Sequence, residues 1–585
     1  MSAIFGVMAR KGELPVKFAS LMRDALADWV RDDESIWTDG RVALGNLQLC
    51  CERRNMVRQP LESENLVVTV DARLDERNNL EKDLGEYSPH DAGLILACYR
   101  RWKQHWAGKV LGDFAAAVYD KSEKSIALAR DYIGVCPLFY HLTPDLFCFS
   151  SDPRALLALP TVSDQLCLRN VTHQVFETRR LVTNGETIYP SLKRLLPGHR
   201  LFVTENSAIL ERYWSPSSRA DSTHTVDEAA QQLRELLESA VETRLGDFSL
   251  ACHLSGGLDS SAVTTLAGRT CQKLGRQLPV AFSWSPPPSG TKQDEQGKVE
   301  FVARQTYDMS VVYAPFSLDS LKQAFGLHPS LGQKLCLVSE LELRGRMGAR
   351  RVLLSGWGGD QAASFDGCGY LAELFLSGRW VSMLRECLLL ARRVNRPPGQ
   401  VLKNWVVRPL IPRQILAIIG KRHHPLRAPV LRHYGVKNLN QILPDLEAVS
   451  RGYGENWLGS RSTIERRYSN FLYPLIQYRL ESWALLGGRS GYRYRYPLLD
   501  RRIVEYALSL PGHHFLFQGV RRRLFRAATR GVLPDPVRRN RDKSEPGGIS
   551  HAEQILTAFL QADFVAEDPV ARATITYLTA GWLQP

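Results

Sequence analysis

The sequence predicts an α/β protein built from two domains. A chain of 585 residues is longer than a single hydrophobic core usually supports, so two or more domains are expected. About the first 210 residues hold short apolar runs bounded by Gly, Asp or charged residues, a pattern typical of stacked sheets with a few helices. From residue 225 onward strand-like and helix-like segments alternate, which predicts a parallel sheet covered by helices.

The strands of the first part begin almost at residue one. Residues 3–9 are apolar and precede two basic residues, the reverse of the order in a secretory signal peptide, so we expect a buried strand there. Residues 215–222 are polar and look like a linker. We therefore place the domains at residues 1–213 and 214–585. Further runs of strand length lie at residues 41–44, 66–70, 114–119 and 125–129.

The second part opens with a helix. Thr225 and Glu228 form a capping box, and apolar residues then repeat at helical spacing. Residues 249–254 are strand-like, a glycine loop and another helix follow, and residues 280–284 predict the next strand. Long amphipathic stretches beyond residue 370, such as residues 383–394, predict mostly helical structure.

Composition excludes several classes of protein. Hydrophobic residues make up 44% and charged residues 23%, which is typical of a soluble globular protein. No apolar run approaches the roughly 18 residues of a membrane span, so we expect no membrane association. The eleven cysteines show no CxxC pair and no metal-binding spacing, which disfavours zinc sites and disulfides and favours a reducing cytoplasm.

The net charge of +14 is unevenly distributed. The segment from Arg379 to Arg432 holds twelve Lys or Arg residues and one acid, Glu386. Such a stretch most often forms a solvated surface, and the main alternative is a docking surface for an acidic peptide or protein. A membrane surface or nucleic acid is a weaker alternative. Nucleic acid is the weakest because no binding motif accompanies the segment.

The strongest chemical signal is the loop at residues 255–261, which reads Ser-Gly-Gly-Leu-Asp-Ser-Ser between a strand and a helix. Its glycines let the backbone approach phosphate oxygens, and the helix that follows points its N-terminal amides at the anion. Asp259 would repel phosphate unless a divalent cation lay between them. Since no Gly-Lys-Ser/Thr follows, this is not a Walker loop. The alternative to a phosphate-binding loop is a glycine–serine turn that binds no ligand.

A second glycine loop supports the first. Residues 351–354 predict a strand, and residues 355–360, which read Ser-Gly-Trp-Gly-Gly-Asp, follow at its carboxyl end. Ligands of α/β sheets bind at this end of the strands. A glycine turn that ends in Asp is common by itself, so this loop gains its meaning from residues 255–261.

Residues 255–261 resemble the PP-loop of the ATP pyrophosphatases, which split ATP into AMP and pyrophosphate while they adenylate a substrate. Residues 355–360 resemble the second signature of the asparagine synthetase family, in which the acid at the position of Asp360 shares the magnesium ion. The resemblance implies ATP and Mg²⁺ as cofactors, with Asp259 and Asp360 as metal ligands. The ATP-binding residues that it implies are Leu254, Ser255, Gly256, Gly257, Leu258, Asp259, Ser260, Ser283 and Gly356.

The resemblance runs nearly from end to end. It implies an Ntn-hydrolase-like αββα sandwich followed by a PP-loop ATP pyrophosphatase domain, which is an adenine nucleotide α-hydrolase-like fold. Stretches similar to the amidotransferase domain lie at residues 130–140, 196–199 and 212–214, and those similar to the synthetase domain at residues 496–502, 507–511 and 541–543.

The chain departs from this family at three places. Glutamine-using members carry a cysteine nucleophile directly after the initiator methionine, where this chain has Ser2. The glutamine-binding Asn-Gly-Glu pattern has become Asp-Ala-Arg-Leu-Asp at residues 71–75. We therefore expect a domain that keeps the fold without glutaminase chemistry. Asparagine synthetases normally have Glu where this chain has Gln361, which puts the contacts to an aspartate substrate in doubt.

Without glutaminase chemistry, the amine is expected to belong to the substrate. Two branches of the family fit, the β-lactam synthetases and the lasso-peptide macrolactam cyclases. The amino-acid sequence at residues 71–77 and 355–360 resembles the cyclases more. β-Lactam synthetases deprotonate the amine with a Tyr–Glu dyad whose glutamate aligns with Arg493, which stays protonated. A shifted alignment would place an acid such as Glu481 there instead.

Lys543 aligns with a lysine that stabilises the tetrahedral transition state in β-lactam synthetases, although a lysine in a basic stretch is often only solvated. The resemblance implies ATP-dependent isopeptide formation in a lasso-type peptide, through an acyl-adenylate of an Asp or Glu side chain. It also implies a precursor peptide, a leader-binding protein and a leader peptidase as partners. A β-lactam synthetase, an ammonia-dependent asparagine synthetase-like amide ligase and a catalytically silent ATP-binding scaffold are the alternatives.

Overall fold

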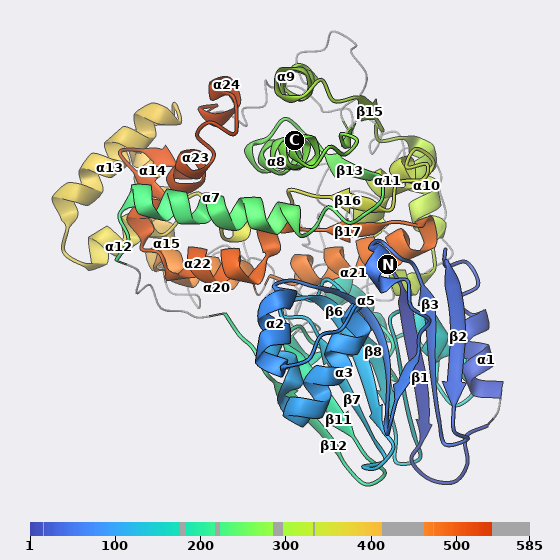
Figure 1. Ribbon diagram of the computed structural model, residues 1–585. Coiled ribbons are helices and arrows are strands. Elements are labelled where there is room, and N and C mark those ends of the chain that lie inside the picture. The colour runs from blue at the N-terminus through green and yellow to red at the C-terminus, as the bar shows by residue number, and fades with distance from the viewer. Residues whose placement is uncertain are drawn as a thin grey trace.

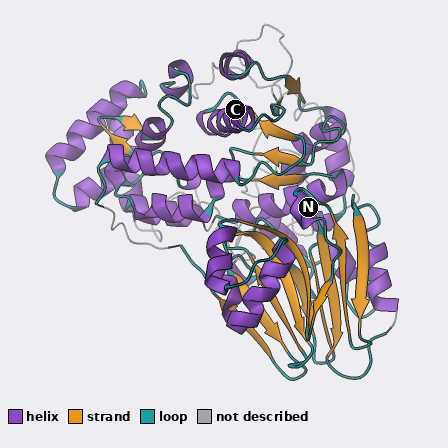
Figure 2. Cartoon of the chain, viewed as in Figure 1, coloured by secondary structure: helices purple, strands orange, loops and turns teal. Residues whose placement is uncertain are grey.

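In this computed structural model, a strand-rich N-terminal domain lies against a domain in which helices surround a smaller sheet (Figure 1; Figure 2). The structure describes residues 1–15, 17–175, 183–216, 223–284, 296–331, 334–411, 461–471 and 473–540.

Two six-stranded sheets form the N-terminal domain. The strands of the first are β1 (Ala3–Ala9), β2 (Asp33–Thr38), β3 (Val42–Gln48), β8 (Phe139–Leu142), β9 (Leu146–Ser150) and β10 (Lys193–Arg194). Those of the second are β4 (Leu61–Ser63), β5 (Leu66–Leu74), β6 (Gly112–Asp120), β7 (Ser125–Arg130), β11 (His199–Val203) and β12 (Ala208–Arg212). Their orders are β10-β8-β9-β1-β3-β2 and β12-β11-β7-β6-β5-β4. The strand predicted at residues 3–9 is β1.

Side chains alternate along β1 and so create two separate cores. Ile4 and Met8 point into the space between the sheets, whereas Phe5 and Val7 face the outer layer of helices. Helices also cover the outer face of the second sheet. The predicted αββα sandwich is confirmed. Its helices are α1 (Lys17–Asp24), α2 (Arg77–Leu84), α3 (Asp91–Trp102), α4 (Pro153–Leu157) and α5 (Leu168–Val175).

A five-stranded parallel sheet forms the centre of the second domain. Its strands, in spatial order, are β15 (Val311–Tyr313), β14 (Val280–Ser283), β13 (Leu250–His253), β16 (Val352–Leu354) and β17 (Arg493–Arg495). The strands predicted at residues 249–254, 280–284 and 351–354 correspond to β13, β14 and β16. All three are buried, as parallel strands covered on both faces must be.

Helices cover both faces of this sheet. The capping box of Thr225 and Glu228 begins the first of them, as predicted. The helices next to the sheet are α7 (Val226–Glu242), α8 (Leu258–Lys273), α9 (Gln296–Thr306), α10 (Leu318–Gly326), α11 (Lys334–Arg344), α21 (Pro474–Ser490) and α22 (Arg501–Ser509). A helical lobe at the left of Figure 1 includes α12 (Tyr370–Leu376), α13 (Trp380–Arg393), α14 (Pro398–Leu402), α20 (Thr463–Phe471), α23 (Arg523–Ala528), α24 (Asp535–Arg538) and the hairpin of β18 (Leu516–Phe517) and β19 (Val520–Arg521).

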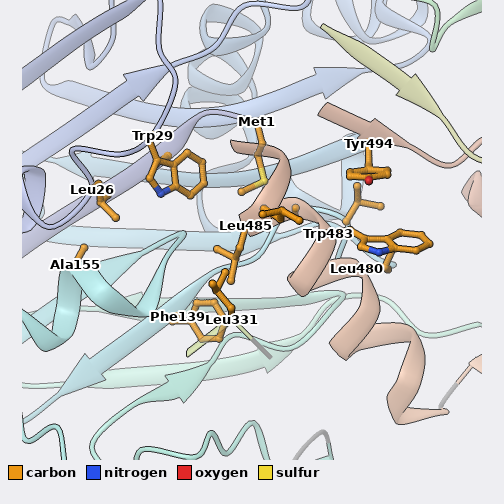
Figure 3. Close-up of a cluster of buried hydrophobic side chains, with 14 of the residues drawn as sticks. Met1, Leu26, Trp29, Phe139, Ala155, Leu331, Leu480, Trp483, Leu485 and Tyr494 are labelled. Carbon is orange, nitrogen blue, oxygen red and sulfur yellow. The ribbon is translucent and has the colours of Figure 1, made fainter. Parts of the chain in front are cut away.

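The two domains share one hydrophobic core along α21. Figure 3 shows Leu480, Trp483 and Leu485 of this helix among side chains of the N-terminal domain, including Met1 and Trp29. The contact is close at Gly488, where a Cβ atom would lie 2.1 Å from the Trp29 ring. Only glycine therefore allows the helix to lie this close.

Candidate functional site

The first glycine loop connects β13 to α8, and no side chain of its cap residue occupies the amides of the first helical turn. Gly256 has φ of +72°, which favours glycine, and a Cβ there would lie 2.6 Å from Lys298 Cβ. Ser255 and Ser260 fold the loop on itself, with 3.0 Å between their hydroxyl oxygens. Gly257 caps the sixteen-residue α8 without a side-chain hydrogen bond to its first turn. The helix terminus can therefore donate to an anion.

The second loop lies directly against the first. A Cβ on Gly356 would come within 2.5 Å of the Ser260 backbone nitrogen, so the two backbones pass with no space for a side chain. A Cβ on Gly359 would lie 2.9 Å from Oδ1 of Asp259. This approach brings the carboxylates of Asp259 and Asp360 to the same place at the carboxyl edge of the sheet.

Arg522 joins these two carboxylates. Its Nη1 lies 3.3 Å from Asp259 Oδ2, and its Nη2 lies 2.5 Å from Asp360 Oδ1. Arg522 adopts φ of +56° immediately before α23, a left-handed conformation that is uncommon for residues other than glycine. This residue was not among the predicted site residues, since nothing in the run of three arginines at residues 521–523 distinguishes the middle one.

The two carboxylates are chemically suited to magnesium. Mg²⁺ in nucleotide sites is usually held by one or two carboxylates together with substrate phosphates. Among the described residues, no group of three or more His, Cys, Asp or Glu side chains converges as a complete metal site. Asp259 and Asp360 therefore fit an ion whose remaining ligands come from the nucleotide.

The remaining predicted residues lie in different surroundings. Leu254 and Ser283 are buried at the carboxyl ends of β13 and β14, where the Leu254 amide donates to the Phe282 carbonyl at 2.8 Å. Both lie at the base of the first glycine loop, where they support it. Lys543 lies outside the described residues.

Aromatic side chains form a wall beside the loops. His253 Nδ1 lies 3.2 Å from the Ser355 hydroxyl, and its ring centroid lies 4.3 Å from that of Trp284. The Arg479 guanidinium lies 5.3 Å from the Trp357 ring and 4.5 Å from the Trp483 ring. Burial, together with the charge of Arg479, lowers the pKa of His253 to about 3, so this imidazole is neutral at neutral pH.

Comparison with known proteins identifies both parts of the chain. Residues 1–214 match the glutamine amidotransferase domain family, and residues 232–562 match the asparagine synthase family. The chain belongs to the asparagine synthetase family. Enzymes of this family are ATP-dependent ligases that release AMP and pyrophosphate, and the predicted family and fold are confirmed.

Named relatives are distant, and several match only in part. Asparagine synthetase [glutamine-hydrolyzing] 3 of Bacillus subtilis is 28% identical over 44% of this chain and 43% of its own length. Asparagine synthetase [glutamine-hydrolyzing] 1 of the same organism is 23% identical over 79% of this chain and 72% of its own length. Amidase chyE of Penicillium rubens is 25% identical over 34% of this chain and 30% of its own length. The chain thus spans less than half the length of two of these relatives.

This asparagine synthetase family member has almost no space at its amidotransferase site. Ser2 is buried, and its hydroxyl accepts a hydrogen bond from the Leu49 amide at 3.1 Å, while its own amide donates to Asp71 at 3.3 Å. The cavity that Ser2 lines with Asp71 and Arg493 measures only about 20 Å³. Such a volume admits about one water molecule and no glutamine side chain.

The alternation of β17 explains how Arg493 comes to fill that cavity. Successive side chains of a strand point to opposite faces, so Tyr494 faces the aromatic wall, whereas Arg493 and Arg495 face the amidotransferase domain. Arg493 Nη1 lies 2.9 Å from Asp71 Oδ1, and Arg495 pairs with Glu52. Burial opposes the charge of Arg493, but Asp71 together with Cys136, Cys51 and Glu52 more than offsets this and raises the pKa of Arg493 above its usual value.

Glu481, the acid that a shifted alignment would place as the base for the amine, forms ion pairs at the domain interface. Glu481 lies buried between Arg194, at 2.7 Å, and Arg130, at 3.1 Å, both from the amidotransferase domain. It stabilises the interface and does not face the two loops.

Within the described residues, no helix is long and apolar enough to cross a membrane.

Proposed function

We propose that this protein closes a macrolactam in a lasso-type peptide. ATP binds at the two glycine loops, and a carboxylate oxygen of an Asp or Glu side chain in the peptide attacks the α-phosphorus and expels pyrophosphate. The N-terminal amine of the same peptide then attacks the acyl carbon, loses a proton and releases AMP. The cavity filled by Arg493 is the observation that most supports an amine from the substrate, because no free glutamine fits beside Ser2.

The residues of the two loops have distinct tasks in this scheme. The first turn of α8 donates to phosphate oxygens, and Arg522 is placed to accept the pyrophosphate charge once Asp259 and Asp360 take other partners. Asp259 and Asp360 would hold Mg²⁺, which when bound supplies positive charge to the leaving group. Lys543 is proposed to stabilise the oxyanion that forms at the acyl carbon.

The aromatic wall is proposed to protect the acyl-adenylate. Water competes with the amine for the activated carbonyl, so a dry wall and a held amine both favour ring closure. Trp357 of the second loop packs on Trp483 of α21 with 5.9 Å between ring centroids, which places aromatic rings next to the nucleotide loops. The partners proposed with this function are the precursor peptide, a leader-binding protein and a leader peptidase.

An ammonia-dependent amide ligase is the second candidate, since the family match is compatible with it. Gln361 weighs against an asparagine product, whereas the filled amidotransferase site weighs only against glutamine as the nitrogen donor. A β-lactam synthetase is disfavoured because Arg493 and Glu481 are both bound at the domain interface and neither is placed as a base for the amine.

The deciding experiment weighs the product. The enzyme is incubated with ATP, magnesium and a candidate precursor, with and without its leader and with and without ammonium. The proposal expects a product lighter by one water, resistant to aminopeptidase and independent of ammonium. A side-chain amide that appears only with ammonium would instead establish the amide ligase.

A further inference from the structure

A cavity of about 380 Å³ lies near the nucleotide loops without including them. Its walls are the first turn of α7, the end of α13, the β18–β19 hairpin, and the short helices α23 and α24. Seven of its lining residues are arginines, and one, Asp227, is an acid. A cavity lined by one sign of charge concentrates ligands of the opposite sign.

Most of these guanidinium groups lack a balancing carboxylate. Arg538 and Arg539 share Asp535, at 2.6 Å and 3.1 Å. Arg393 and Arg521 form no ion pair with any residue in the described ranges of the chain, and Arg530 acts on Asp535 only from beyond ion-pair distance. The positive charge of the cavity is therefore largely uncompensated by the described residues.

The guanidinium group of Arg526 is held in one position in the cavity by hydrogen bonds to backbone carbonyls. Its Nε donates to the Arg521 carbonyl at 3.0 Å, and its Nη2 donates to the Asn540 carbonyl at 2.9 Å. These carbonyls orient the guanidinium without neutralising it. Burial, together with Arg522 and other neighbouring arginines, lowers its pKa to about 10, the direction expected where like charges converge.

We propose that this cavity binds an acidic segment of the peptide substrate, held by carboxylates other than the one that is adenylated. The inference rests on the proposed function, because it takes the substrate to be a peptide. Planar guanidinium groups bind carboxylates with two parallel hydrogen bonds, so several of them around one cavity favour a segment with more than one carboxylate. Anchoring such a segment would hold the reacting carboxylate near the loops.

The lining favours peptide carboxylates over nucleotide phosphates. Arg522 contacts both loop carboxylates, whereas its neighbours Arg521 and Arg523 line the cavity, so consecutive residues serve two separate places. Val394 and Val520 also line the cavity and give aliphatic contacts that a peptide uses and a phosphate group does not. The volume lies within the range of ordinary ligand sites.

The test measures binding of fluorescein-labelled hexaglutamate to the full-length protein by anisotropy, without ATP. Wild type should bind hexaglutamate and not hexaglutamine. Arg521→Glu with Arg530→Glu should weaken binding at least tenfold. The matched control, Arg385→Glu with Arg396→Glu, makes the same change of net charge on exposed residues at and just beyond α13 and should bind like wild type.

Equal weakening in both double variants would reduce the effect to overall charge and overturn the proposal, as would absence of binding by the wild type. Displacement by inorganic pyrophosphate at lower concentration than by unlabelled hexaglutamate would also overturn it, since that result indicates a phosphate site. Matching circular dichroism spectra and melting temperatures establish that the variants are folded. Because no nucleotide and no ring closure enter the assay, its result is independent of whether the proposed cyclisation succeeds.

Discussion

Arg493 on β17 forms a buried salt bridge with Asp71 on β5, with 2.9 Å between Nη1 and Oδ1. The Nη2 atom of the same guanidinium lies 3.1 Å from Cys136 Sγ. A side chain of the ligase domain therefore completes the interior of the amidotransferase domain.

Removal of one partner of this bridge should destabilise the whole protein. Arg493→Ala leaves Asp71 buried without its partner, and loss of one member of a buried pair costs roughly 3–5 kcal/mol. Urea unfolding followed by circular dichroism measures the loss. Arg493→Met combined with Asp71→Leu should unfold with a smaller loss, because it leaves no unpaired buried charge. A double variant less stable than the single one would contradict this account.

The two loop carboxylates should be needed for adenylation and not for folding. Asp259→Asn and Asp360→Asn each remove a charge from the proposed metal site and should lower substrate-dependent pyrophosphate release by about 100-fold or more. The control is Asp366→Asn, a half-buried aspartate six residues beyond Asp360 whose acceptor oxygen the asparagine retains. Wild-type rates in either loop variant would remove the metal assignment.

Ser2 should have no catalytic part. The purified enzyme should release no glutamate from glutamine, and Ser2→Ala should leave product formation unchanged, because the pocket around Ser2 holds about one water molecule. Glutamate formation that disappears in Ser2→Ala would show an active glutaminase.

Lys543 should act on the second chemical step. Lys543→Ala is expected to slow ring closure more than pyrophosphate release, since negative charge builds at the acyl carbon only when the amine attacks. A well-placed cation is worth roughly 3–4 kcal/mol there. Rapid-quench measurement of acyl-adenylate and product separates the steps. Equal slowing of both would assign the lysine to the nucleotide instead.

His253 should make the protein sensitive to acid. Its pKa is about 3 in the folded state and 6.5 as the ordinary value, so the unfolded chain binds the proton more readily between these limits. Stability from this group is complete above about pH 6.5 and falls by roughly 1.4 kcal/mol per pH unit as pH decreases toward 3. His253→Gln should flatten that slope in unfolding measurements, whereas His105→Asn, at an exposed position, should not.

The sequence predicted the parts of the fold that depend on local patterns. The two glycine loops, the strands before them and the capping box at Thr225 all use residues close together in the chain. The fold of the amidotransferase domain followed from short motifs in the order of the family. Each of these local patterns can be interpreted without knowing which residues pack against it.

Contacts between residues far apart in the chain leave no local pattern in the sequence. Arg493 was recognised as unsuitable for a base, but its partner Asp71 is 422 residues away in the chain. Arg522 reaches Asp259 and Asp360 only because of its left-handed backbone, which a run of arginines does not reveal. The Tyr-Arg-Tyr-Arg-Tyr alternation at residues 492–496 was the one available signal that this strand presents different chemistry to its two sides.

The close fit of Gly488 against Trp29 makes the N-terminal domain part of the support on which α21 packs. Deleting residues 1–213 would expose the apolar side of α21 and leave Arg493 and Arg495 without Asp71 and Glu52 at the same time. The N-terminal domain is thus part of the folding unit of the ligase domain.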